Sequence, residues 1–299
     1  MAIANSNPQQ TAFPCAAYAS EQVDAPSELA VVIPCYNEAE CLADLKTALI
    51  QLRSAFDAQA RSEQCRLQLL LVDDGSSDDT PSLLRQHFDG DPAVTILRHA
   101  TNLGVAAAIA TGLRHARAEI VASLDADLTY DPLQLLPMLR LLAADVDLVV
   151  ASPYHPLGKV QGVPRWRLGL SRSASRLYRL ILRNKLQTYT SCVRVYRRSS
   201  VVDLPLDNGG FAGVVELVCR LDQRGGKIVE YPALLTLRKA GQSKMRVAST
   251  ILAHVRLMVW AAQLRLFGSP RDATLQTGLL PSSPGSELFS PVTSRNSTS

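Results

Sequence analysis

The chain has 299 residues, 47% of them hydrophobic and 19% charged, and carries a formal net charge of +4. This composition is typical of a globular α/β protein that buries a hydrophobic core. The six cysteines include no C-x-x-C pair, which disfavours metal ligation by cysteine and predicts reduced thiols. The first residues lack the basic and apolar regions of a secretory signal, so we expect a cytoplasmic protein.

Hydrophobic periodicity divides the chain into tails and one domain. Residues 1–27 and 269–299 are rich in Ser, Thr, Pro, Gln and Asn without periodicity, and we expect both to be disordered tails. Apolar runs typical of buried strands fall at 29–34, 67–72, 93–97, 119–124 and 146–151. Helical patterns separate them, at 38–60, 78–88, 103–117 and 131–143. This alternation predicts a mostly parallel sheet flanked by helices.

The pattern changes after residue 151, but we expect the later elements to complete the same sheet. They are a helix at 165–186, a strand at 192–197, a helix at 212–225 and a strand at 227–237 that is broken at Pro232. The prediction is therefore a single domain over residues 28–246.

One part of the second half is strongly basic. From Ser152 to Val202 the chain has no Asp or Glu, while Lys and Arg accumulate. Such a block indicates an anionic partner, either a phosphate group or an acidic lipid surface. Nucleic acid is disfavoured, because the block lacks interleaved stacking aromatics and has the period of one amphipathic helix.

The segment 247–268 has the length of a membrane span but a polar middle, because Arg256 lies halfway along it. A central arginine costs about 2.5 kcal/mol or more on insertion scales, which disfavours a span. Two other structures remain open. The helix lies in the bilayer interface with Trp260, Leu264 and Phe267 inward, or it packs on the protein's own core. The interfacial form predicts a protein held peripherally on the cytoplasmic face of a membrane.

Three apolar runs end abruptly in polar or acidic residues. They are Val-Val-Ile-Pro-Cys-Tyr-Asn-Glu at 31–38, Leu-Leu-Val-Asp-Asp-Gly-Ser at 70–76 and Leu-Asp-Ala-Asp at 124–127. Buried parallel strands look like this when they deliver side chains to the carboxyl edge of a sheet, where ligands of open α/β sheets bind. Asp125 and Asp127 point the same way along a strand and are suited to hold Mg²⁺ or Mn²⁺ against a phosphorylated ligand. The alternative is a solvated loop.

The other strand ends offer groups for a nucleotide. An ionised carboxylate of Asp73 or Asp74 accepts hydrogen bonds from a base N–H, unless it forms a turn at Gly75. Tyr36 is placed to stack on a base. The sequence contains neither a G-x-G-x-x-G after a strand nor a G-x-x-x-x-G-K-[ST], which disfavours dinucleotide-dependent oxidoreductases and P-loop enzymes.

These runs, with Asn102–Gly112, resemble the family-two glycosyltransferases over residues 29–246, and above all the polyprenol-phosphate mannosyltransferase (dolichyl-phosphate mannose synthase-like) branch. The resemblance implies a nucleotide-sugar-binding domain of the A type with a UDP- or GDP-linked donor. It also implies a glycine at 112 that permits close packing. The resemblance implies a donor site lined by Pro34, Tyr36 and Glu38, with Asp74 as the contact to the base. It also implies that Asp125 and Asp127 bind the metal and the diphosphate. Lys244 belongs to an R-x-x-G-x-S-K loop that begins at Arg238 and closes over the donor.

The same resemblance implies an acceptor site for a lipid phosphate. Arg167 and Ser171, one helical turn apart, match a pair that holds the acceptor phosphate. Thr190–Arg198 resembles a T-S-G-F-R-x-Y motif, in which Arg194 is a second phosphate ligand. The chain departs from the branch at Thr129, Pro153, Thr188 and Cys192-Val193.

The implied reaction is inverting transfer of a sugar, in which the acceptor attacks the anomeric carbon in line with the leaving nucleoside diphosphate. A polyprenyl phosphate is anionic near pH 7 and needs cations but no base. The implied catalytic residues are Asp127, Arg167, Arg194 and Glu216. Glu216 is the base if the acceptor is a sugar hydroxyl; otherwise it forms an ordinary ion pair with Arg220. A nucleotide-sugar-binding protein without turnover is the third alternative.

Overall fold

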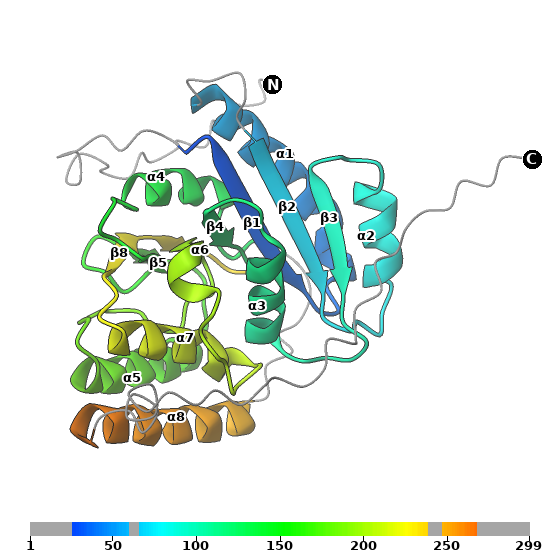
Figure 1. Ribbon diagram of the computed structural model, residues 1–299. Coiled ribbons are helices and arrows are strands. Elements are labelled where there is room, and N and C mark those ends of the chain that lie inside the picture. The colour runs from blue at the N-terminus through cyan, green and yellow to red at the C-terminus, as the bar shows by residue number, and fades with distance from the viewer. Residues whose placement is uncertain (1–25, 60–65, 239–246, 268–299) are drawn as a thin grey trace, which may run out of the picture.

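The computed structural model describes residues 26–59, 66–238 and 247–267. A seven-stranded sheet in the order β3-β2-β1-β4-β7-β5-β8 carries helices on both faces (Figure 1). The strands are β1 (Glu28–Cys35), β2 (Arg66–Asp73), β3 (Val94–Arg98), β4 (Ile120–Ser123), β5 (Leu148–Ser152), β7 (Arg194–Arg197) and β8 (Ile228–Pro232). β7 runs antiparallel to its neighbours β4 and β5, and the other pairs in this sheet are parallel. The predicted mostly parallel α/β fold is confirmed.

The helices alternate with these strands through the first half of the chain. They are α1 (Leu42–Gln59), α2 (Thr80–Phe88), α3 (Val105–His115), α4 (Leu135–Arg140), α5 (Arg165–Ile181), α6 (Arg198–Val201), α7 (Phe211–Gln223) and α8 (Val247–Phe267). A second, two-stranded parallel sheet, β6 (Lys159–Val160) with β9 (Leu234–Leu235), lies outside the main sheet. β9 falls within the strand predicted at 227–237 and broken at Pro232, whereas β6 was not predicted.

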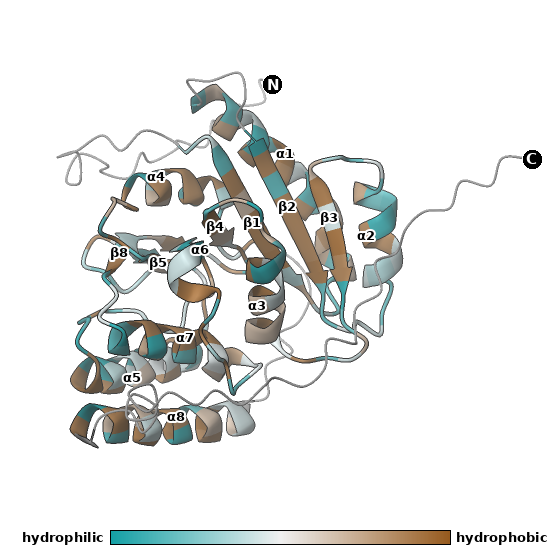
Figure 2. Ribbon diagram, in the orientation of Figure 1, coloured by the Kyte–Doolittle hydropathy of each residue, from teal (hydrophilic) through white to brown (hydrophobic). Residues whose placement is uncertain are grey.

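Each buried strand supplies two cores because successive side chains point to opposite faces. In β1, Leu29, Val31 and Ile33 pack with α1, α2 and α4. Ala30 and Val32 pack with α3 and α7 on the other face. In Figure 2, β1 and β2 are coloured as hydrophobic along most of their length, as expected of strands that are covered on both sides.

The strand register brings the polar strand ends to one edge. Cys35 of β1 pairs with Asp73 of β2, and Asp73 pairs with Arg98 of β3. On the other side of β1, Val32 pairs with Ser123 of β4. The residues that follow these strands therefore meet at the carboxyl edge.

Gly112 lets α3 lie directly against β1, as expected. A Cβ atom at this position would lie 2.2 Å from Cγ1 of Val32, closer than real atoms approach. A glycine is required here by the packing of helix on strand.

The C-terminal helix α8 packs on α7 and α5, with Leu257 and Ala261 buried (Figure 1). The Tyr178 hydroxyl lies 3.0 Å from Nδ1 of His254, and the guanidinium of Arg220 lies over the Trp260 ring at 4.8 Å. Trp260 packs against the core and over Arg220, which is the contact expected of a helix that packs on the protein's own core. None of the helices in the described part of the chain combines the length and apolarity needed to cross a membrane.

Four cysteines lie in the described part of the chain, and none of them forms a disulfide there. Cys35, Cys41, Cys192 and Cys219 are buried. Cys15 and Cys65 lie outside the described residues.

Candidate functional site

Four charged side chains from distant parts of the chain meet at the carboxyl edge of the sheet. Asp125 and Asp127 follow β4, Glu38 follows β1, and Arg238 follows β9. Nε and Nη2 of Arg238 each lie 2.9 Å from Oδ2 of Asp127. Nη2 also lies 2.9 Å from Oε1 of Glu38. The guanidinium thus holds the position of a cation between two carboxylates that are 200 and 111 residues away from it in the sequence.

The electrostatics of this cluster favour a bound cation. Burial, followed by the charge of Asp127, raises the pKa of Asp125 above its usual range. Burial also raises the pKa of Glu38, although Arg238 opposes the change. Burial alone would lower the pKa of Arg238, but Asp127 and Glu38 outweigh it and raise that pKa. Carboxylates crowded in this way repel one another, and added positive charge relieves the repulsion.

The loop that carries Asp127 is fixed by its own hydrogen bonds. Oδ1 of Asp127 accepts from the Thr129 amide at 3.0 Å and from the Thr129 hydroxyl at 2.9 Å. Leu128 between them has φ of 55°, a left-handed conformation that costs about 1–3 kcal/mol for such a residue. The Thr129 carbonyl accepts from the Thr236 amide at 2.8 Å. Thr129 therefore ties the aspartate loop to the segment that delivers Arg238.

The residues present fit a divalent cation. Carboxylate oxygens are the ligands that Mg²⁺ and Mn²⁺ prefer, and Arg238 shows that a positive charge is accommodated here. Within the described ranges, no group of three or more His, Cys, Asp and Glu side chains surrounds one point. Two protein carboxylates suffice where phosphate oxygens and water complete the coordination.

Of the other residues predicted for the donor site, the structure describes Pro34 and Tyr36 but not Lys244. Pro34 lies at the end of β1 and Tyr36 just beyond it, both half-buried at the same edge. Their contact with a nucleotide stays a prediction. Lys244 lies outside the described residues.

Asp74 requires a correction, because its carboxylate is already saturated. Oδ1 lies 2.7 Å from Nδ1 of His99 and 2.9 Å from the Leu103 amide. Oδ2 accepts from the Gly104 amide at 2.7 Å and from the Asn102 side chain at 3.0 Å. A carboxylate has about four lone-pair sites, and all are used. Asp74 is buried and holds the loop before α3 instead of offering an acceptor to a base.

Arg194 also requires a correction. It is completely buried, and Nε, Nη1 and Nη2 donate to the carbonyls of Ser191, Val214 and Tyr189 at 2.8, 2.6 and 2.8 Å. A side chain that binds three carbonyls inside the core does not reach an acceptor phosphate. Arg194 therefore joins β7 to α7 and to the 189–191 loop.

Glu216 forms the ion pair with Arg220 that the i,i+4 spacing of these two residues allowed. It is buried, and Oε1 accepts from Nε of Arg220 at 2.8 Å. Oε2 accepts from the amide and side chain of Asn208 at 2.9 and 2.8 Å. The Asp207 amide adds a further bond at 3.0 Å. This corrects the prediction that Glu216 acts as a general base, because a carboxylate with these partners has no lone pair available for a proton.

Arg167 and Ser171 both lie on α5, and Ser171 contacts the loop that contains Thr190. Oγ of Ser171 lies 2.6 Å from Oγ1 of Thr190. The exposed guanidinium of Arg167 lies 5.3 Å from the centre of the Trp166 ring. Their phosphate-binding role stays a prediction.

Two tyrosines and one thiol near the carboxylate cluster were not predicted from the sequence as site residues. Tyr130 hydrogen-bonds to Ser191, and Cys192 hydrogen-bonds to Asp125. Tyr154 hydrogen-bonds to Ser171. The available signal was position: Tyr154 comes two residues after the end of β5, and Tyr130 three residues after Asp127.

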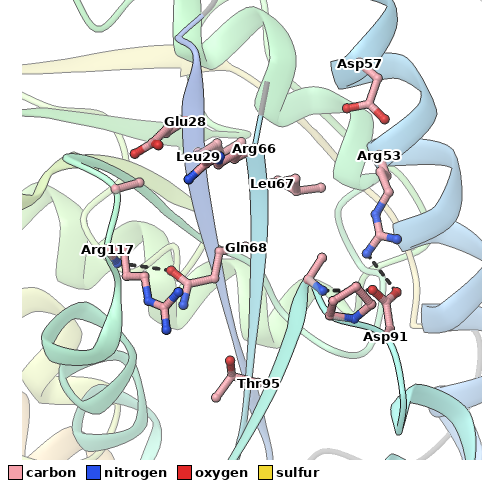
Figure 3. Close-up of a pocket in the computed structure, with 13 residues that line it drawn as sticks. Glu28, Leu29, Arg53, Asp57, Arg66, Leu67, Gln68, Asp91, Thr95 and Arg117 are labelled. Carbon is pink, nitrogen blue, oxygen red and sulfur yellow. Dashed lines mark hydrogen bonds and ion pairs between the residues drawn. The ribbon is translucent and has the colours of Figure 1, made fainter. Parts of the chain in front are cut away.

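A cavity of about 540 Å³ lies elsewhere, at the amino ends of β1 and β2 (Figure 3). Its arginines are balanced by carboxylates, and Nη2 of Arg53 lies 2.9 Å from Oδ2 of Asp91. None of the described site residues lines it. It is therefore separate from the carboxylate cluster.

The fold is the α/β fold of the A-type glycosyltransferases. The family model described as glycosyl transferase family 2 matches residues 30–204. The chain belongs to this family and is a glycosyltransferase that uses a nucleotide-sugar donor.

The relatives are similar over most of their lengths. The chain is 30% identical to polyprenol monophosphomannose synthase of Mycolicibacterium smegmatis, over 79% of this chain and 88% of that protein. It is 31% identical to undecaprenyl-phosphate mannosyltransferase of Micrococcus luteus, over 79% and 95%. Among solved structures, glucosyl-3-phosphoglycerate synthase of Mycobacterium tuberculosis, in complex with Mn²⁺, UDP and glucosyl-3-phosphoglycerate, has a TM-score of 0.56 at 19% identity. That match covers 80% of this chain and 79% of the synthase, and supports the fold.

Proposed function

We propose that the protein is an inverting, metal-dependent glycosyltransferase that moves a sugar from a nucleoside diphosphate to a polyprenyl phosphate. The observation that carries the proposal is the carboxylate cluster, in which Asp127 and Glu38 contact the Arg238 guanidinium and Asp125 interacts with Asp127. The two mannosyltransferase relatives support the lipid phosphate as acceptor and make mannose the first sugar to test.

On the donor side, Asp125 and Asp127 would hold Mg²⁺ or Mn²⁺. When bound, the ion supplies charge neutralisation of the leaving diphosphate. Arg238 sits against Asp127 in the structure, so its guanidinium has to leave that carboxylate when a cation binds there. Pro34 and Tyr36 lie at the same edge and would contact the nucleoside, with Lys244 on the donor phosphates; the base is uracil or guanine.

On the acceptor side, an oxygen of the lipid phosphate attacks the anomeric carbon. The bond from that carbon to the donor phosphate oxygen breaks, its electron pair leaves on the nucleoside diphosphate, and the configuration inverts. The acceptor phosphate has a second pKa near 6 and is largely dianionic at pH 7, so no base is needed. Arg167 and Ser171 would position it.

A hydroxyl acceptor is less well supported because it needs a base. Glu216, the residue predicted for that role, is buried and fully hydrogen-bonded. A phosphate acceptor makes no such demand, which favours the lipid phosphate.

The outer surface of α5 and α8 fits a peripheral membrane protein. Exposed apolar side chains gather on both helices: Trp166, Leu170, Leu177, Leu180, Ile251, Leu252, Val255 and Val259. Neither helix contains Asp or Glu, and both carry arginines. Apolar side chains flanked by arginines match an anionic bilayer surface. We expect sedimentation with anionic vesicles and weaker binding of a Leu252→Ser, Val255→Ser variant.

The substitution Asp127→Asn tests the proposed function. We expect at least a 100-fold loss of metal-dependent transfer, because one charged ligand is removed. Asp44→Asn on the exposed surface of α1 is the matched control and should keep full activity. Full transfer by Asp127→Asn, with the fold verified by circular dichroism, would overturn the metal assignment.

A further inference from the structure

A second group of side chains connects the carboxylate cluster with α5. Tyr154 follows β5 at the carboxyl edge and hydrogen-bonds to Ser171. The guanidinium carbon of Arg172 lies 5.0 Å from the centre of the Tyr154 ring. Ser171 in turn contacts Thr190 at 2.6 Å, in the loop whose next residues contact Tyr130 and Asp125. Arg172 is therefore linked to the metal carboxylates through a short chain of contacts.

The charge of Arg172 is available to a ligand. The side chain belongs to an exposed residue, and no carboxylate in the described part of the chain lies within ion-pair distance of it. A guanidinium stacked on an aromatic ring is oriented by the ring, while its in-plane N–H groups remain able to bind a phosphate in a bidentate manner. Arg194, by contrast, uses its nitrogens on buried carbonyls.

Two other arginines of α5, Arg176 and Arg179, do not share this geometry. Arg176 and Arg179 line a separate shallow hollow with Leu180 and Lys185. They follow Arg172 by one and two helical turns, away from Tyr154. Arg176 thus offers a control with the same charge on the same helix.

We propose that Arg172, oriented by Tyr154, is the second cationic ligand of the acceptor phosphate, beside Arg167 and Ser171. The inference rests on the proposed function, since it names the residue that binds the acceptor. It replaces Arg194 in that role and makes Tyr154 a positioning residue that acts through Arg172.

Steady-state kinetics with a short, soluble polyprenyl phosphate test this assignment, together with calorimetric binding of the same acceptor in the absence of donor. We expect Arg172→Gln to raise the acceptor KM and Kd at least tenfold, with the donor KM unchanged. Arg172→Lys should recover part of the loss. Tyr154→Leu should raise the acceptor KM several-fold and Tyr154→Phe less, because phenylalanine keeps the ring. Arg176→Gln should stay within twofold of the wild type.

The outcomes separate this inference from the proposed function. Wild-type transfer with an unchanged acceptor KM and Kd in Arg172→Gln would overturn the inference alone. An equal loss in Arg176→Gln would also overturn it, because the effect would then be one of general charge. A wild-type protein that neither binds nor uses the polyprenyl phosphate would overturn both. Binding without transfer, lost in Arg172→Gln, would support the inference and contradict the proposed reaction.

Discussion

The carboxyl edge of β1 and β4 and the helical region around α7 both contain charged residues, but they use them differently. At the sheet edge, Asp125, Asp127 and Glu38 are half-buried, and Asp127 and Glu38 share one guanidinium. Near α7, Arg194 and Glu216 are buried, and their polar atoms are taken by carbonyls, amides and Arg220. Hydrogen-bonding capacity left for a ligand therefore distinguishes a binding residue from a structural one, even where both lie in motif-like sequence.

Replacing Arg194 is the change that tests this comparison most severely. Arg194→Met leaves three buried carbonyls without donors, and each costs about 1–3 kcal/mol. We expect the free energy of unfolding in urea to fall by about 3 kcal/mol or more. A variant that keeps wild-type stability and loses only acceptor affinity would show that Arg194 binds phosphate after all.

The second test concerns Glu216. Glu216→Gln weakens the buried ion pair with Arg220, and we expect a loss of about 2 kcal/mol in the free energy of unfolding. The pH dependence of kcat should be unchanged, because Glu216 moves no proton. If the pH profile of kcat in this variant lacks a basic group that titrates in the wild type, Glu216 acts as a general base and the acceptor is a hydroxyl.

Arg238 tests the sheet-edge side of the comparison. If its guanidinium occupies the position of a cation, Arg238→Gln should bind Mn²⁺ about tenfold more tightly without nucleotide, as measured by electron paramagnetic resonance. The control is Arg98→Gln, which removes an exposed arginine paired with Asp73 at 3.0 Å. Equal Mn²⁺ affinities in all three proteins would contradict the competition.

The smallest expected effect is at the joint between α5 and α8. Burial lowers the pKa of His254 below its usual value of about 6.5. The unfolded chain then binds more protons than the folded one below that pH. His254 therefore costs no stability above pH 6.5 and weakens the fold as the pH falls below it. We expect His254→Gln to show a shallower decline in stability between pH 7 and 5 than the wild type.

The sequence was sufficient to predict the parallel sheet and the sheet edge that carries the donor-site residues, for one physical reason. Buried strands are continuous apolar runs, and their polar ends mark one edge of the sheet, so Asp125, Asp127 and Glu38 could be placed together. The direction of β7 could not be predicted, because a strand buried on both faces has the same pattern in either orientation.

The roles of the misassigned residues depend on contacts distant in the sequence. Arg194 meets the Val214 carbonyl, and Asp74 meets amides near residue 103. A motif gives the residue type at a position but not how many of its hydrogen bonds the fold has already used. The contact between Arg172 and Tyr154 likewise joins separate elements, α5 and the end of β5, and could not be derived from the sequence.

Sugar transfer by the wild-type protein tests the proposed function directly. The wild-type protein is incubated with a panel of GDP- and UDP-sugars, a short polyprenyl phosphate and Mn²⁺ or Mg²⁺, and the lipid product is detected by mass spectrometry. We predict one glycosylated polyprenyl phosphate, with the mannose donor tested first, that disappears when the metal is chelated. Equal product formation in the presence of chelator, or slow donor hydrolysis with no lipid product, would contradict the account.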